Sequence, residues 1–382
     1  MRARTLLGIC LISMTVAACS DDKAATPTQP TQQPPAAPPT LTAPSSDTPE
    51  DDQQLDTLRP TLRIANATSN QTGAKTYEFQ VSDSSDFAAM SASGYARVFK
   101  LVSAKAGIPE DGSGKTSFDV TDDLQPTTRF YWRARVRQGT TDGPWSSTRS
   151  FKTQIQGYNR PGELYDPLTN GQTVGVPVGN IQVIPGKGFQ VLSNDSHVRY
   201  QLAQTLTSGE FSLEAEGINN DTPGDKTKIL SMYDGNGDIT TSDYRFTVEK
   251  RDGGIIAWRF IAGGDCCQID TVGGERVPVG FSPSQTYGFK AAWGGGFNLK
   301  IYAGGLSGAK VYDFGKGVGG TYAPQPHFGY LGSPIGRAGP NDASVVGAIY
   351  RNVYIGNTSR PQSLGSALLP KGSVSPFATS TR

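Results

Sequence analysis

Short segments with apolar side chains at every second position recur along most of the chain, and glycine-rich turns separate them. Alternation with a period of two is typical of β-strands that bury one face, whereas an amphipathic helix repeats every 3.6 residues. Glycine (46 residues) and proline (26 residues) interrupt the 382-residue chain too often for a helical bundle. The sequence therefore predicts an all-β protein that is long enough for two domains.

The N-terminus has the features of an export signal. Two arginines precede an apolar stretch, Leu6 to Val16, and the segment ends in the motif V-A-A-C at Cys19. The apolar stretch is too short to cross the ~30 Å of bilayer hydrocarbon as a helix. The segment resembles a bacterial lipoprotein signal, which implies removal of residues 1–18 and lipidation of Cys19. An ordinary secretory peptide cleaved near the same place is the alternative.

The segment after Cys19 has an unusual composition. Eight prolines lie between Asp21 and Glu50, and Leu41 is the one large aliphatic residue there. Such a segment cannot bury enough apolar surface to offset the entropy lost on ordering. Residues 19–50 are therefore predicted to form a disordered tether. The first folded domain is placed at residues 38–154, so the end of the tether overlaps its start.

Two period-two runs mark this first domain, one from Tyr77 to Val81 and one from Phe130 to Val136. The L-x-P-x-T turn that begins at Leu124 and the G-P-W-S segment that ends at Ser146 resemble fibronectin type III domains of bacterial surface proteins. The resemblance implies a β-sandwich that acts as a spacer or adhesive module. Phe130 stands where these domains usually have tyrosine, so the corner hydrogen bond is missing. The stripe Arg133, Arg135 and Arg137 is either a solvated strand face or a contact for an acidic partner.

Residues 157–359 contain further strand-like segments between glycine-rich turns, which is typical of a two-sheet jelly roll. The segments G-E-F-S-L-E-A-E (209–216) and F-G-Y-L-G-S (328–333) resemble strands of concanavalin-A-like, laminin-G-like sandwiches. This superfamily contains lectins and glucanases, so the resemblance implies a jelly roll that binds carbohydrate. Residues 361–382 are rich in Ser, Thr, Gly and Pro and are predicted to form a flexible tail.

Glu214 and Glu216 are candidate catalytic residues. They stand two residues apart on one predicted strand, which places them ~7 Å from each other, a spacing compatible with the paired carboxylates of sugar hydrolysis. Related glycosidases carry Glu-x-Asp-x-(x)-Glu on one strand, and Ser212 stands where the aspartate is needed. Alginate-lyase-like jelly rolls carry Tyr-Phe-Lys-x-Gly-x-Tyr, and the strand that begins at Tyr287 departs at most of these positions. We therefore expect no catalytic site and a solvated face for the two glutamates. A polysaccharide hydrolase or lyase is the alternative.

Asp234, Asn236 and Asp238 place oxygen ligands at alternate positions of one loop, an arrangement that suits Ca²⁺. Ile239 occupies the position of the invariant glycine of a calcium loop, so a plain Asn-Gly hairpin turn is the competing interpretation. No other cofactor is indicated. The adjacent Cys266 and Cys267 would form a strained vicinal disulfide in an oxidising compartment, or stay reduced, or pair with other molecules.

Aromatic residues are the candidate ligand contacts, because sugar rings stack on exposed indole and phenol faces. We select Tyr244, Trp293 and Tyr322. Trp293 comes first, since it directly precedes a Gly-Gly-Gly turn and is expected at an exposed loop.

The charges are balanced, with 35 basic and 34 acidic residues, which argues against nucleic acid as a partner. The sequence thus predicts a protein that is anchored by lipid to a bacterial membrane, at the outer membrane or the cell surface. It is expected to bind a glycan or another surface polymer without cleaving it. A structural module that docks on an envelope protein is a further alternative.

Overall fold

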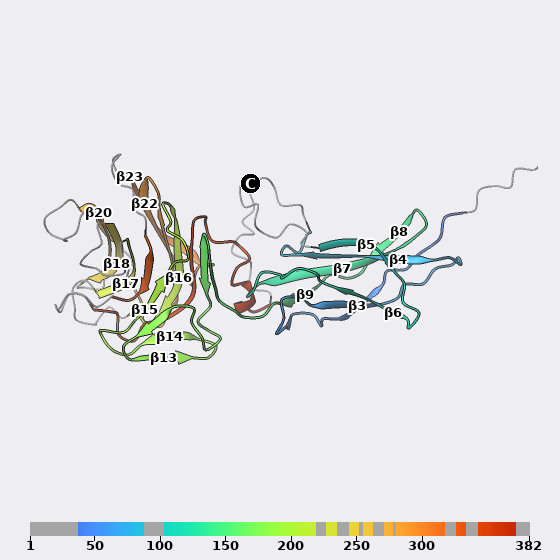
Figure 1. The fold of residues 1–382 in the computed structure, drawn as a ribbon, viewed down its shortest axis with the longest axis horizontal. Coiled ribbons are helices and arrows are strands. Elements are labelled where there is room, and N and C mark those ends of the chain that lie inside the picture. Colours follow the sequence, from blue (N-terminus) through green and yellow to red (C-terminus); the bar gives the residue numbers. More distant parts are fainter. Residues whose placement is uncertain are drawn as a thin grey trace, which may run out of the picture. The chain divides into compact units, whose positions relative to one another are not determined.

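The computed structural model describes residues 37–87, 103–218, 227–234, 244–251, 255–262, 271–277, 280–317, 326–333 and 343–371. For residues 103–106, 244, 251, 255–262, 271–277 and 316–317 the description is limited to the backbone. Strands make up nearly all regular structure in this part of the chain, and they form two successive β-sandwiches (Figure 1). The predicted all-β fold class is confirmed.

The N-terminal sandwich consists of two sheets. One sheet has the order β1 (Ser45–Thr48), β3 (Thr61–Ala65), β6 (Lys115–Asp119). The other has the order β2 (Gln53–Gln54), β9 (Arg149–Lys152), β7 (Arg129–Gln138), β4 (Lys75–Ser82), β5 (Ser103–Pro109), and β8 (Thr141–Trp145) pairs with β7. The period-two residues of β4 and β7 fill the core between the sheets, and Phe130 stacks on Phe151 with ring centroids 5.9 Å apart.

The arginine stripe of β7 belongs to the packing of this sandwich. The Arg133 guanidinium lies over the rings of Phe87 and Trp145, at 4.1 and 4.3 Å from their centroids. Arg135 forms an ion pair with Glu78, and Asp142 pairs with both Arg135 and Arg137. Arg135 and Arg137 are therefore paired with the domain's own carboxylates, whereas Arg133 packs on aromatic rings and donates to the Gln80 side-chain oxygen.

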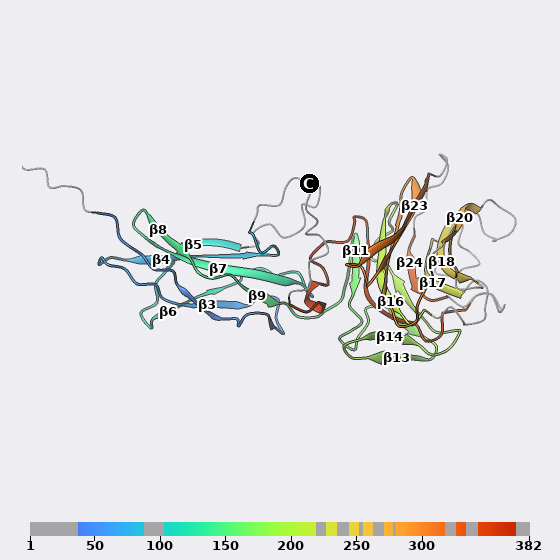
Figure 2. The same cartoon turned by 180° about the vertical axis from the view of Figure 1, so that it is seen from behind.

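The C-terminal sandwich also consists of two sheets (Figures 1 and 2). The first, called the β16 sheet, has the order β10 (Tyr158–Arg160), β11 (Glu163–Asp166), β25 (Ile349–Gly356), β16 (Gly209–Glu216), β21 (Tyr287–Trp293), β22 (Gly296–Ala303), β23 (Ala309–Gly317), and the hairpin of β13 (Ile181–Ile184) and β14 (Gly188–Val191) attaches to β25. The second, called the β17 sheet, has the order β12 (Val176–Val178), β15 (His197–Gln201), β24 (Phe328–Leu331), β17 (Thr227–Tyr233), β18 (Tyr244–Arg251), β19 (Ile255–Ala262), β20 (Thr271–Val277). Neighbouring strands of both sheets are antiparallel.

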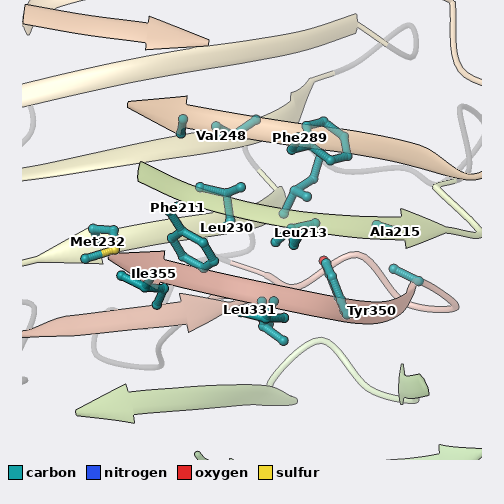
Figure 3. Close-up of a cluster of buried hydrophobic side chains, with 14 of the residues drawn as sticks. Phe211, Leu213, Ala215, Leu230, Met232, Val248, Phe289, Leu331, Tyr350 and Ile355 are labelled. Atoms are coloured by element: carbon teal, nitrogen blue, oxygen red, sulfur yellow. The ribbon is translucent and has the colours of Figure 1, made fainter. Parts of the chain in front are cut away.

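The core of this sandwich lies between the two sheets. Phe211 and Leu213 of β16 and Leu230 and Met232 of β17 are among the residues that meet there, each at most 1% exposed (Figure 3). Full burial of each such side chain contributes ~1.5–3 kcal/mol. Because side chains alternate along a strand, the residues between these positions lie on the two outer faces of the sandwich.

The segment after β25 differs from the predicted flexible tail. Its described part, residues 361–371, contains the 3₁₀ helix η1 (Ser366–Leu368). Leu364 is 3% exposed and packs on Tyr165 and Tyr354, while the Arg360 guanidinium donates to the Asn352 and Leu364 carbonyl oxygens. A hydrogen bond from the Gly365 N–H to the Thr127 carbonyl also ties it to the N-terminal sandwich. The composition does not reveal these contacts of residues 361–371, and residues 372–382 lie outside the described chain.

Candidate functional site

The outer face of the β17 sheet carries a concentrated set of polar and aromatic side chains. Core residues alternate with them on each strand, for example Val198 and Tyr200 on β15 or Phe246 and Val248 on β18. The face is defined here by His197, Arg199 and Gln201 of β15, Phe328 and Tyr330 of β24, Lys228, Ser231 and Tyr233 of β17, and Arg245, Thr247 and Glu249 of β18. Apart from Arg199 and Gln201, each is at most 7% exposed. The accessible part of the face therefore lies along β15, where Arg199 is half-buried and Gln201 is exposed.

Strand register aligns these side chains in rows across the sheet. The first row runs from Arg199 through Tyr330 and Ser231 to Thr247. The second runs from Gln201 through Phe328 and Tyr233 to Arg245. Since neighbouring strands lie ~4.8 Å apart, each row presents a hydrogen-bonding or aromatic group about every 5 Å.

An aromatic cluster forms the middle of the face. Tyr233 and Tyr330 meet edge to face with ring centroids 5.4 Å apart, and the His197 ring lies 5.9 Å from that of Tyr330. Gly329 separates Phe328 from Tyr330 and faces the core, where an added Cβ would lie 2.5 Å from Ile355 Cδ1. The missing side chain lets β24 approach the β16 sheet closely while its two rings face outward.

Charged side chains occupy one end of the same face. Lys228 and Glu249 are directly opposite each other on β17 and β18, at 4% and 2% exposure. The Thr247 hydroxyl donates a 2.8 Å hydrogen bond to Glu249. Charges at this depth require partners or ligands, because desolvation penalises an isolated ion.

Burial lowers the pKa of His197 below its ordinary value of 6.5, and the charge of Arg199 acts in the same direction. The imidazole is therefore neutral at pH 7. Its Nδ1 lies 3.2 Å from the Asp195 carbonyl oxygen, which places the ring proton on that nitrogen. The Nε2 atom of this tautomer is a hydrogen-bond acceptor.

Glu214 and Glu216 lie on the opposite side of the sandwich, on the outer face of the β16 sheet. The Arg351 guanidinium donates to both carboxylates, at 3.3 and 3.1 Å. Glu214 also accepts from the Leu306 N–H at 2.9 Å, and Glu216 from the Thr286 hydroxyl at 3.2 Å. The side chains are 12% and 26% exposed, so the predicted solvated face is instead a half-buried ion-pair network.

Trp293 is not an exposed contact residue. It is 4% exposed, its ring lies 5.6 Å from that of Phe246 in the core, and its Nε1 donates to the Leu206 carbonyl oxygen at 3.3 Å. The prediction was wrong because β21 extends to Trp293 itself, which has the same strand parity as Phe289 and Ala291. The triple-glycine turn begins only after this inward position.

Several predicted site residues cannot be placed. Asp234 follows β17, whereas Asn236 and Asp238 lie outside the described residues, as do Tyr322, Cys266, Cys267 and Cys19 together with the whole signal segment, and the Tyr244 side chain. Within the described ranges, no three His, Cys, Asp or Glu residues gather as a metal site. Nor does any helix of those ranges have the length and apolar character needed to span a membrane.

The residues of the β17 sheet's outer face were missed by the sequence analysis, except that Tyr330 and Phe328 lie in a motif used for fold resemblance. A local signal was present, since K-I-L-S-M-Y (228–233) and Y-R-F-T-V-E-K (244–250) alternate polar and apolar residues. The grouping across strands required the register.

No protein-family model matches the chain, and no curated protein matches it. Among solved structures it is similar to the enzymatically active domain of tailspike protein 2 of bacteriophage CBA120, with a TM-score of 0.32 and 15% identity over 54% of this chain and 31% of that chain. It is also similar to a mutant of alginate lyase Aly36B in complex with an alginate tetrasaccharide, with a TM-score of 0.31 and 14% identity over 51% of this chain and 96% of that one. The FN1–FN3 domains of chicken CNTN1 match with a TM-score of 0.19 and 8% identity over 72% and 66% of the two chains. The chain spans about a third of the tailspike chains, and at these identities the likenesses concern the fold alone.

Proposed function

We propose that this chain is a lipid-anchored cell-envelope protein that binds a polysaccharide on the outer face of the β17 sheet without cleaving it. The observation that supports this most is the pair of registered rows from β15 to β18, which place aromatic rings between hydrogen-bonding side chains. Their spacing, set by the strand separation, is about the length of one sugar unit. Aromatic faces with adjacent polar groups are typical of carbohydrate recognition.

Binding without hydrolysis is supported by the distribution of carboxylates. Glu249 is the one carboxylate among the residues that define this face, whereas hydrolysis by two carboxylates needs a pair on either side of the bond. Glu214 and Glu216 are engaged with Arg351 on the other sheet. The ion pairs between these glutamates and Arg351 connect β16 with β25.

Eliminative cleavage is the second candidate. The Tyr330 ring lies beside the neutral imidazole of His197 and meets the ring of Tyr233, and Arg199 is the register partner of Tyr330. A lyase uses a phenol or an imidazole to transfer a proton. It also uses a cation to stabilise the negative charge that develops on the substrate.

Glycan-array binding with the mature full-length chain tests the proposal. Gln201→Ala removes an exposed amide from the second row and is expected to weaken binding about three- to tenfold. Lys310→Gln, an exposed position on the β16 sheet, is the matched control and should bind like wild type. No binding to any glycan, or equal binding by both variants and wild type, would refute the assigned face.

The same preparations separate the enzyme alternatives. New reducing ends that disappear in a Glu214→Gln, Glu216→Gln double variant would favour a hydrolase. Unsaturated products that absorb in the ultraviolet and disappear in Tyr330→Phe would favour a lyase. A pull-down that recovers one envelope protein and no sugar would favour a docking role.

The proposed anchor has its own test. Replacement of Cys19 by serine should abolish incorporation of labelled fatty acid and release the protein from the membrane fraction. Persistent membrane association of Cys19→Ser with no labelled lipid would contradict the anchor, without bearing on the glycan-binding face.

A further inference from the structure

We infer that residues 361–371, called the C-terminal clamp, couple the folding of the two sandwiches. The C-terminal sandwich holds the clamp in place, and the clamp in turn stabilises the N-terminal sandwich. Successive sandwiches joined by a single linker usually move and unfold separately. Here the described residues from Pro39 onward belong to one compact unit, and the clamp adds a second connection to that of the linker. The inference does not depend on glycan binding.

The C-terminal sandwich fixes the start of the clamp. Leu364 is 3% exposed and packs on Tyr165 and Tyr354. The Arg360 guanidinium, just before the clamp, donates to the carbonyl oxygens of Asn352 and Leu364 at 2.9 and 3.0 Å. Since Tyr165 lies on β11 and Asn352 and Tyr354 lie on β25, the clamp keeps its position only while this sandwich is folded.

The clamp then forms hydrogen bonds with the N-terminal sandwich. The Gly365 N–H donates to the Thr127 carbonyl oxygen at 3.0 Å. The Arg129 N–H donates to the Ser366 hydroxyl oxygen at 2.8 Å, and the Arg129 guanidinium donates to the Leu369 carbonyl oxygen, also at 2.8 Å. Arg129 is 7% exposed. Loss of the clamp would therefore leave buried donors of the N-terminal sandwich without their acceptors, which is costly.

The linker between the sandwiches meets the clamp at Thr127. This residue has a φ of 52°, in the left-handed region that β-branched residues rarely adopt. Its N–H donates to the Gln154 carbonyl oxygen at 2.8 Å, and its hydroxyl oxygen accepts from the Gln156 N–H at 3.0 Å. Such a conformation persists where the surroundings over-determine it. The linker and the clamp supply this constraint together, because they bind different groups of one residue.

The end of the clamp contributes less. Lys371 forms an ion pair with Asp51, which also accepts from the Ser150 N–H at 3.0 Å. The Lys371 side chain is 57% exposed, and exposed ion pairs add little stability. The coupling therefore depends on the hydrogen bonds at Thr127 and Arg129.

Gly365→Ala is the variant that displaces the clamp. Gly365 has a φ of 88°, and an added Cβ would lie 2.5 Å from Asn352 Oδ1 and 2.8 Å from Arg360 Nη2. Both of these side chains belong to residues only 8% exposed, so they have little room to move. Gly186→Ala is the matched control, because Gly186 has a φ of 76° and an added Cβ there meets nothing within 4 Å. The two variants share the backbone cost and differ in the clash.

Hydrogen exchange of the mature full-length chain, followed by mass spectrometry, measures the coupling. The reporter is the centre of β7, residues 132–136, in the N-terminal sandwich. Exchange there requires opening of this sandwich, so its rate reports the stability of the sandwich. Gly365→Ala should accelerate exchange of these amides about tenfold or more, because at least two hydrogen bonds to the clamp are lost. Gly186→Ala should leave their exchange at the wild-type rate.

Ser366→Ala is a milder variant, which removes the acceptor of the Arg129 N–H and leaves Leu364 and Gly365 unchanged. It should accelerate exchange of residues 132–136 about three- to tenfold, and it provides the test if Gly365→Ala does not fold. Faster exchange in residues 361–371 alone, with wild-type rates at residues 132–136 in these variants, would overturn the inference. Equal acceleration by Gly186→Ala would overturn it as well, since the effect would then not require the clamp.

Discussion

Arg351 of β25 and Glu214 of β16 are register partners on adjacent strands, and the Arg351 guanidinium donates to the Glu214 carboxylate at 3.3 Å. The same guanidinium reaches Glu216 and the Thr286 hydroxyl. One cation therefore satisfies two half-buried anions that stand two residues apart on a strand. This arrangement explains how a sheet face can carry two neighbouring glutamates.

Arg351→Met is expected to lower the free energy of unfolding of the C-terminal sandwich by about 2 kcal/mol, because it leaves two half-buried carboxylates without their cation. Denaturant unfolding monitored by intrinsic fluorescence measures this change. Lys310→Gln, which disrupts an exposed ion pair, is the control and should alter stability little. An unchanged midpoint in Arg351→Met would contradict the structural role of the network.

Trp293→Phe should reduce stability by about 2 kcal/mol and leave glycan affinity unchanged. The variant loses the hydrogen bond from Nε1 to the Leu206 carbonyl oxygen and leaves a small cavity beside Phe246. Thermal unfolding and glycan binding are measured on the same sample. A loss of affinity with no loss of stability would restore Trp293 as a ligand contact.

Burial raises the pKa of Asp166 to about 6, although the Thr173 and Tyr200 hydroxyls and two backbone N–H groups donate to it. Its ordinary value is 3.8, so the folded protein binds more protons than the unfolded chain between about pH 4 and 6. Stability from this group therefore increases as the pH falls through that window, by up to about 3 kcal/mol. Unfolding free energies of wild type minus those of Asp166→Asn, measured from pH 7 to pH 4, should rise by this amount. A flat difference would show that Asp166 titrates normally.

Leu364→Ala should destabilise the C-terminal sandwich by about 2–3 kcal/mol, because Leu364 fills the space against Tyr165 and Tyr354. Gln362→Ala, two residues earlier and exposed, is the matched control. Denaturant unfolding of both variants provides the comparison. Equal stability of the two would support the flexible tail that the composition suggested.

The fold could be predicted from the sequence because its signal is local. Period-two alternation marked Tyr77, Phe79 and Val81, and all three are fully buried. The same rule applied to β21 would have placed Trp293 in the core with Phe289, but the glycines after it favoured a loop. The error was to prefer turn composition over strand parity.

The candidate site could not be predicted in the same way, because it depends on pairing between distant segments. Arg199, Tyr330 and Ser231 become neighbours only when β24 inserts between β15 and β17. Likewise, no residue near Glu214 in the sequence indicates that Glu214 pairs with Arg351, which lies more than a hundred residues later. Polar alternation shows which residues share a face, while the register decides which of them meet.

The position of β25 has a consequence for folding during synthesis. This strand pairs with β11, β14 and β16, all of which are synthesised much earlier. A polypeptide that emerges from N- to C-terminus thus keeps the edges that pair with β25 unpaired until Ile349–Gly356 has been synthesised. Products truncated before residue 349 would present unpaired backbone edges to one another, so we expect them to be prone to aggregation and proteolysis.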